Sequence, residues 1–158
     1  WRIGDTYNVS IGQGDFLVTP LQLINFISSI GNGGKIYQPF VKKDTVPKIL
    51  ADYSDWQSEL TAVQKGLMDA VEQPYGSSHS LADLPMKVAG KTGTPQTRNN
   101  LRLNAFFAGY GPTDNPSGPQ IAILVFVENA REGSLNAVPV ATDVLEWYYF
   151  NRLNNSQN

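Results

Sequence analysis

The sequence predicts an α+β fold in which helices pack on an antiparallel sheet, and three observations lead to this prediction. Apolar residues recur at helical spacing between residues 20 and 30 and again near residues 61–71. Between residues 86 and 128 the pattern changes to three strand-like segments, separated by polar or glycine- and proline-rich connections. A last helical pattern starts near residue 139. We therefore expect one domain with a thin core of three strands and three helices.

The composition excludes several classes of function. Hydrophobic residues make up 41% of the 158 residues, which is typical of a folded protein rather than a disordered one. The net charge of −2 and the lack of a basic cluster argue against a nucleic-acid partner. With no cysteine and a single histidine, His79, we expect no metal site, and no cofactor motif appears. No apolar run is long enough to span a membrane. The chain starts at Trp1 rather than at methionine, so we expect it to be part of a longer protein.

The first third of the chain predicts a loop, a helix and short strands. Residues 1–18 are rich in glycine and show no helical period, so we expect an ordered loop. Thr19 and Pro20 are typical of a helix cap and of the first helical position. The apolar face of that helix comprises Leu23, Ile24, Ile27 and Ile30, and the glycine-rich segment 31–34 ends it. Prolines interrupt a weak alternation over residues 35–50, which favours short edge strands.

A second helix is predicted to begin near Thr61, because Thr61 and Gln64 have the spacing of a capping box. We expect its buried face to consist of Val63, Leu67, Ala70 and Val71. Residues 74–85 then form a polar loop that contains His79 among serines. A catalytic histidine and a solvated loop histidine are both compatible with this context, and the second interpretation is favoured.

Three strands are predicted in the second half, over residues 86–94, 104–110 and 120–128. The apolar run in the third is typical of a strand covered on both faces, and we expect antiparallel pairing. Residues 111–119 are typical of a turn. The final helix should begin near Pro139 and lie across the sheet through Val140, Val144, Leu145 and Tyr148.

The stretch Lys91-Thr92-Gly93-Thr94 carries the chemistry. Along a strand, Thr92 and Thr94 share one face and Lys91 reaches round from the other. An ammonium, two hydroxyls and backbone N–H groups approachable at Gly93 would bind a carboxylate beside a reacting carbonyl. Pro95 favours an edge position for this strand, since proline cannot donate a hydrogen bond to a neighbouring strand.

This stretch has two other interpretations. Taken alone, the tetrapeptide favours a plain strand end that runs into a turn. A phosphate-binding loop is excluded, because Pro85 stands where its first glycine belongs and because Gly93 and Pro95 block the helix that should follow.

Four segments in order resemble the C-terminal part of the transpeptidase domain of class B penicillin-binding proteins, especially the cell-elongation type. They are the segment from Trp1 through Gly4-Asp5-Thr6 to Ile11–Gly14, then Thr19–Gln22 with Asn32–Gly34, then Ala89–Gln96, and finally 107–112 with 127–129 and 137–139. Lys-Thr-Gly is a known signature of β-lactamases and penicillin-binding proteins. The resemblance implies the C-terminal portion of a β-lactamase/transpeptidase-like domain over residues 1–158.

The resemblance also implies acyl transfer to peptidoglycan stem peptides that end in D-alanyl-D-alanine, through an acyl-serine intermediate at which β-lactams stall. Lys91 would orient the terminal carboxylate and hydrogen-bond the serine of an S-x-N motif, and the hydroxyls of Thr92 and Thr94 would bind that carboxylate. The Thr94 N–H would serve as an oxyanion-hole donor, next to Gly93, and Gln96 would line the groove. Implied partners are the remainder of the transpeptidase domain and the cell-elongation machinery, at the extracytoplasmic face of the bacterial membrane.

The sequence departs from the family pattern in one important respect: it contains no S-x-x-K, so the nucleophile is expected in an upstream segment. Its two S-x-N matches, 134–136 and 156–158, follow Lys91 instead of preceding it and are attributed to chance. Two hypotheses remain. The chain is the carboxylate-binding portion of a D,D-transpeptidase, inactive by itself, or it is a non-catalytic fragment or penicillin-sensing module without turnover.

Overall fold

The computed structural model describes residues 1–14, 17–95, 103–115, 118 and 121–154. At its centre lies a three-stranded antiparallel sheet in the order β3-β4-β5, formed by Ala89–Gly93, Leu103–Gly111 and Ile121–Ala130. The prediction of an α+β fold with an antiparallel sheet is confirmed. All three strands lie within about three residues of their expected ranges, although Gln120 and most of the predicted 95–102 loop are outside the described residues.

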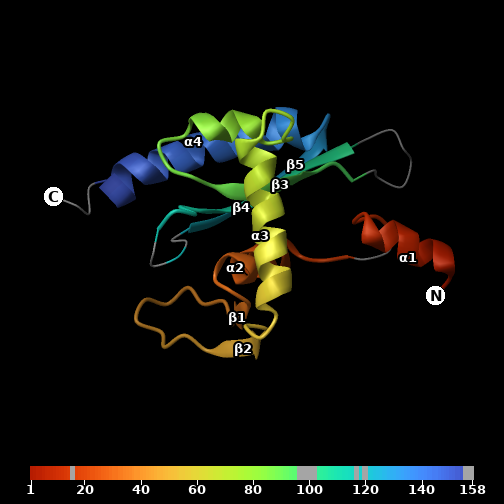
Figure 1. Cartoon of the computed structure of the whole chain (residues 1–158), viewed down its shortest axis with the longest axis horizontal. Coiled ribbons are helices and arrows are strands. Elements are labelled where there is room, and N and C mark those ends of the chain that lie inside the picture. Colours follow the sequence, from red (N-terminus) through yellow and green to blue (C-terminus); the bar gives the residue numbers. More distant parts are fainter. Residues whose placement is uncertain (15–16, 96–102, 116–117, 119–120, 155–158) are drawn as a thin grey trace.

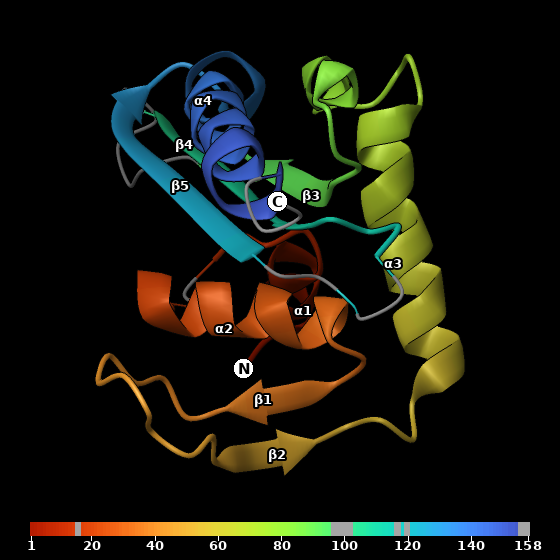
Figure 2. The same cartoon turned by 90° about the vertical axis from the view of Figure 1, so that its left-hand side faces the viewer.

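Helices cover both faces of this sheet. Helix α4 lies on one face, α2 lies on the other, and α3 runs beside the sheet next to β3 (Figures 1 and 2). The described helices are α1 (Ile3–Ser10), α2 (Pro20–Gly31), α3 (Gln57–Glu72) and α4 (Val138–Tyr148), with the short helical turns η1 (His79–Asp83), η2 (Gly133–Ala137) and η3 (Tyr149–Leu153). None of the described helices combines the length and the hydropathy that a membrane crossing needs.

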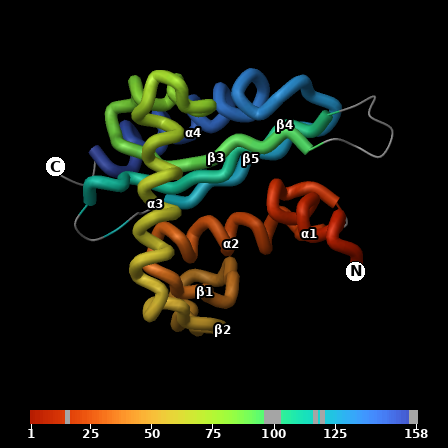
Figure 3. Tube along the Cα trace, turned by 45° about the vertical axis from the view of Figure 1, so that its right-hand side comes forward, coloured from red at the N-terminus to blue at the C-terminus, as the bar shows by residue number. Residues whose placement is uncertain are grey.

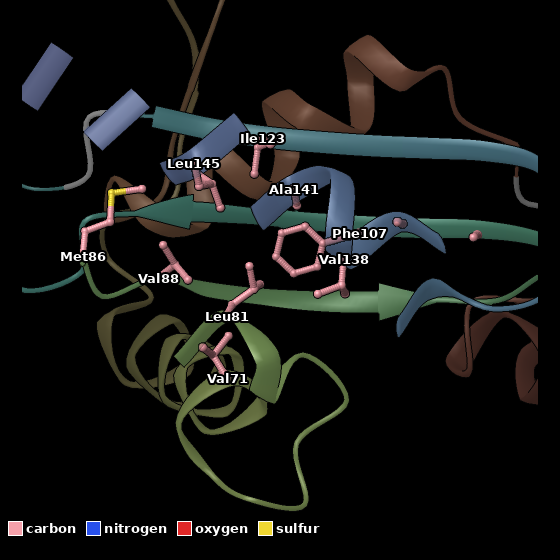
Figure 4. Packing of buried hydrophobic residues seen from close by; sticks show 11 residues of the cluster. Val71, Leu81, Met86, Val88, Phe107, Ile123, Val138, Ala141 and Leu145 are labelled. Atoms are coloured by element: carbon pink, nitrogen blue, oxygen red, sulfur yellow. The ribbon is translucent and has the colours of Figure 1, made fainter. Parts of the chain in front are cut away.

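Two apolar clusters, one on each face, hold the layers together. The cluster beneath α4 (Figure 4) consists of Val71, Leu81, Met86, Val88, Ala105, Phe107, Ile123, Ala137, Val138, Ala141 and Leu145. The cluster toward α2 and α3 consists of Ile27, Ile30, Leu67, Ala89, Ala108 and Tyr110. Successive residues of β4, such as Phe107 and Ala108, enter opposite clusters because strand side chains alternate between faces. The central strand is therefore fixed from both sides.

Strand β5 is packed on both faces, as its apolar run predicts. Ile121, Ile123, Val125 and Val127 contribute to the cluster under α4, whereas Ala122 and Leu124 contribute to the other. Most of these side chains stay half-buried, because β5 lies at the margin of the described sheet.

The short strands expected within residues 35–50 are confirmed in part. β1 (Lys35–Tyr37) and β2 (Ile49–Asp52) form a separate antiparallel pair that lies beyond α2 (Figure 2). The segment between them, with both prolines, contains no strand.

The prediction of a loop over residues 1–18 is wrong, because helix α1 occupies Ile3–Ser10. The backbone N–H of Arg2 donates to Asp5 Oδ2 at 2.6 Å, which caps the first turn, and Gly12 follows with a φ of 74°. None of its residues is buried, so it carries no core-facing apolar stripe that a sequence pattern could reveal. Figure 3 shows α1 projecting to one side.

The predicted start of α3 is also wrong. The helix begins at Gln57, four residues before Thr61, so the presumed capping pair lies inside it. The Gln64 side chain instead donates to the carbonyl oxygen of Ile30 at 2.7 Å. Val63 is exposed, and Leu67 and Val71 form the buried face.

The final helix lies against the sheet as predicted, and its predicted buried face is confirmed in part. Val140 and Val144 are exposed, and the helix packs through Val138, Ala141 and Leu145. Leu145 is thus buried as predicted, whereas Val140 and Val144 are not part of the buried face. In the predicted polar loop 74–85, the turn η1 buries Leu81, which the serine-rich composition does not indicate.

Candidate substrate-binding site

The candidate site lies on β3, which forms one margin of the described sheet. β3 pairs with β4 on one side only, with Lys91 opposite Ala108, Thr92 opposite Phe107 and Gly93 opposite Phe106. The edge position expected from Pro95 agrees with this topology. Hydrogen-bonding groups along such a margin are available to an added peptide segment.

Lys91 is exposed, and its Nζ donates to the carbonyl oxygen of its neighbour Thr92 at 2.6 Å. Among the described residues it has no carboxylate partner, since the ion pair found there joins Lys65 and Asp69. A solvated lysine that makes only a local hydrogen bond can turn toward an anionic ligand at small cost.

Thr92 and Thr94 are half-buried and both lie against Gly133, at the start of η2. The Gly133 N–H donates to Thr94 Oγ1 at 3.1 Å, and a Cβ added at Gly133 would stand 2.9 Å from Thr92 Cβ. The two threonines thus share one side, as strand alternation predicts. The Thr92 hydroxyl is in addition hydrogen-bonded to Ser77 Oγ at 2.8 Å.

Gly93 ends β3 and leaves its surroundings open: a Cβ built there would meet only Phe106 Cβ, at 3.4 Å. Thr94 follows directly, so its backbone lies where the strand leaves the sheet. Gln96, which was predicted to line a groove, lies outside the described residues.

Sequence reasoning missed two residues that contact the site, Ser77 and Gly133. Each lies far from Lys91 in sequence, in a segment interpreted as a connection, and no spacing rule links it to the threonines. His79 is exposed and its Nδ1 lies 2.9 Å from the carbonyl oxygen of Val71, to which the ring donates. That bond ties η1 to the end of α3 and gives His79 a structural role.

The Ser134-Leu135-Asn136 match serves a local purpose. Asn136 Oδ1 accepts hydrogen bonds from the backbone N–H groups of Arg131 and Glu132, at 2.9 and 3.3 Å. The asparagine therefore closes the loop that carries Gly133.

An antiparallel sheet between helices, with Lys-Thr-Gly-Thr on a marginal strand, is the arrangement of β-lactamase and transpeptidase-like folds. The chain belongs to the penicillin binding protein transpeptidase domain family, because the sequence model of that family matches residues 1–146.

Relatives and solved structures agree with this family. The chain is 31% identical to the peptidoglycan D,D-transpeptidase MrdA of Haemophilus influenzae, over 97% of the chain and 27% of that protein, and 28% identical to MrdA of Acinetobacter baumannii, over 98% and 26%. It thus spans about a quarter of the length of these curated relatives.

Two solved structures show the same fold. The penicillin-binding protein PBP2 of Helicobacter pylori, in complex with MreC, matches 96% of this chain and 28% of its own with a TM-score of 0.79 and 28% identity. PBP2 of Pseudomonas aeruginosa, in complex with WCK 5153, matches 96% and 34% with a TM-score of 0.76 and 30% identity.

Proposed function

We propose that this chain is the carboxylate-binding and oxyanion-hole portion of a peptidoglycan D,D-transpeptidase. The observation that carries the proposal is the exposed Lys91 beside two threonines on β3, at the edge that pairs with no other strand in the described part of the chain. A cation, hydroxyls and strand backbone at one edge suit a peptide that adds alongside the strand and ends in a carboxylate.

In the proposed reaction, a serine from a segment outside these residues attacks the penultimate carbonyl of a D-alanyl-D-alanine stem and expels the terminal D-alanine. An amine of a neighbouring stem then attacks the acyl-enzyme and forms the crosslink. A β-lactam would acylate the same serine and stall there. Because no S-x-x-K occurs in the 158 residues, we propose that the chain alone is inactive.

The residues of β3 have separate roles in this proposal. Lys91 orients the terminal carboxylate and hydrogen-bonds the serine of an S-x-N motif supplied by the rest of the domain. The hydroxyls of Thr92 and Thr94 bind the carboxylate, and Gly93 lets the substrate approach the backbone. The Thr94 N–H donates to the oxyanion, and Gln96 lines the groove.

The magnitudes suit these roles. A hydrogen bond to a charged group contributes about 1.5–3 kcal/mol, and loss of one oxyanion donor lowers the rate on the order of 10²–10³-fold. These interactions bind the substrate and stabilise the oxyanion, but they do not replace a nucleophile. The complete domain is needed for turnover.

We also propose that the parent protein acts within a cell-elongation complex at the extracytoplasmic face of the membrane. Support comes from the likeness to a PBP2 that was solved with MreC and to a chain of a peptidoglycan synthase complex, the latter with a TM-score of 0.82 and 31% identity.

A labelled penicillin tests the proposal. A protein that contains the complete transpeptidase domain around this chain should become covalently labelled, whereas the 158 residues alone should not. Labelling of the isolated chain at one of its own serines would contradict the assignment of the nucleophile. A complete protein that is labelled but forms no crosslinks from stem peptides would favour a penicillin-sensing module.

A further inference from the structure

The loop between β5 and α4 comes close enough to β3 that only glycine fits at its point of contact. A Cβ at Gly133 would stand 2.6 Å from the carbonyl oxygen of Phe106 and 3.0 Å from that of Gly93. Both atoms belong to the backbone of the paired strands β3 and β4, so neither can swing aside. Gly133 therefore lies directly on the strand that carries the candidate site.

This close approach gives Thr94 a defined hydrogen bond. The Gly133 N–H donates to Thr94 Oγ1 at 3.1 Å, across 39 positions of sequence, in a half-buried setting. A threonine hydroxyl has one hydrogen to donate and two lone pairs that accept. Once one lone pair is taken by Gly133, the hydroxyl hydrogen remains available for an acceptor, and a carboxylate accepts only.

Thr92 is arranged differently. Its hydroxyl lies 2.8 Å from Ser77 Oγ, so the two hydroxyls share a hydrogen bond. A ligand carboxylate would have to compete with Ser77 for Thr92, whereas the contact that Thr94 makes with Gly133 leaves its donor unused among the described residues.

The loop that presents Gly133 is itself held in shape. Asn136 Oδ1 accepts from the N–H groups of Arg131 and Glu132, and the Asn136 N–H donates to the carbonyl oxygen of Glu132 at 3.0 Å. At the other end, Ala137 and Val138 are fully buried in the cluster beneath α4. The position of the Gly133 N–H is thus set by the core and by one side-chain amide.

We propose that Gly133 is a positioning residue for the carboxylate subsite, with Asn136 as the residue that holds its loop. The Gly133 N–H fixes the Thr94 hydroxyl as an acceptor and leaves its hydrogen directed to the terminal carboxylate of the stem peptide or of a β-lactam. This inference rests on the function proposed above and assigns its carboxylate recognition chiefly to Thr94.

The experiment compares acylation by a labelled penicillin and by its methyl ester, in the protein with the complete transpeptidase domain. Gly133→Ala and Thr94→Val should each lower the acylation rate constant for the free acid on the order of tenfold to a hundredfold, and the double variant should be no worse than Thr94→Val. The ester, which lacks the anionic acceptor, should be affected far less. Thr94→Ser keeps the hydroxyl and should retain acylation by the acid.

Further variants keep the test decisive if Gly133→Ala folds poorly. Asn136→Ala should reproduce the selective loss for the acid, and Asn136→Asp, which keeps an acceptor oxygen, should restore acylation. Gly66→Ala, at a site with open space around it, is the matched glycine control and should acylate like the unaltered protein.

The outcomes separate the two proposals. Equal losses for acid and ester, additive effects of Gly133→Ala and Thr94→Val, or a lower melting temperature with unchanged acylation would overturn the positioning role. Absence of any labelling of the unaltered complete protein would instead overturn the proposed function.

Discussion

The ring of Phe107 on β4 lies directly over Gly90 on β3: a Cβ added at Gly90 would stand 2.5 Å from Phe107 Cζ and 2.9 Å from the carbonyl oxygen of Ala108. Phe107 is fully buried in the cluster beneath α4. The residue just before Lys91 thus contacts the core, so the packing of the Phe107 ring limits what side chain β3 can carry next to the candidate site.

Gly90→Ala should destabilise the fold by about 1–3 kcal/mol, because the added methyl group overpacks against a ring and a carbonyl that cannot both retreat. Urea unfolding with tryptophan fluorescence measures this difference. Gly66→Ala should be stabilising by about 0.5–1 kcal/mol, since it lies in the middle of α3 with nothing within 4 Å. Equal stability of the two variants would contradict the close packing at Gly90.

Lys91→Ala should lower the acylation rate of the complete transpeptidase domain about 10–100-fold, the value of one hydrogen bond to a charged group. The fold should be unchanged, because the side chain is exposed and, among the residues that the structure describes, hydrogen-bonds to its neighbour alone. Stopped-flow acylation with a fluorescent penicillin gives the rate. Lys87→Ala, four residues earlier and also exposed, is the control; if both variants acylate at the normal rate, Lys91 has no place in the site.

The side-chain bond from Gln64 to the carbonyl oxygen of Ile30 joins α3 to the last turn of α2. Gln64→Leu should cost about 1 kcal/mol of unfolding free energy, because the Ile30 carbonyl oxygen loses its 2.7 Å donor and keeps, among the described residues, only the Gly33 N–H, at 3.4 Å. Lys65→Ala, which removes the exposed ion pair with Asp69, should change stability much less. Thermal unfolding of the two variants side by side checks the order, and a larger loss for Lys65→Ala would reverse our ranking.

Burial raises the pKa of Tyr110 to about 12 from its ordinary value of 10.0. In the unfolded chain this phenol ionises near pH 10, whereas in the folded protein it keeps its proton to about pH 12. Stability should therefore be complete below pH 10 and fall progressively between pH 10 and 12. Melting temperatures across that range test the slope: Tyr110→Phe should flatten it, and Tyr75→Phe, at an exposed site, should leave it unchanged.

Sequence patterns predicted a hydrogen bond correctly where both of its partners lie within a few residues of each other. Thr19 caps α2, with Oγ1 accepting from the Gln22 N–H at 3.2 Å, three residues away. The same kind of spacing at Thr61 failed, because Gln64 has its partner on another helix, 34 positions away. The sequence of α3 contains no indication of that contact with α2.

The candidate site divides in the same way. Residues 91–94 carry their chemistry in their own types and alternation, so the strand could be proposed from the sequence. The partners of its hydroxyls could not, since Ser77 and Gly133 reach Thr92 and Thr94 only through the packing of η1 and η2 against the sheet. The burial of Ser77's neighbour Ser78, whose hydroxyl has no hydrogen-bond partner among the described residues, was equally unforeseen.

Helix α1 spans eight residues, none of them buried, and Trp1 and Ile3 are 87% and 74% exposed. A helix so short gains too little from its own backbone to persist in water, because below about 12 residues propagation does not offset the cost of nucleation. The described contacts of α1 bury none of its residues and so do not offset that cost. We therefore expect the start of the chain to be frayed in the isolated 158 residues and more helical in a protein with the complete transpeptidase domain, and the fluorescence of the Trp1 indole offers a way to follow that difference.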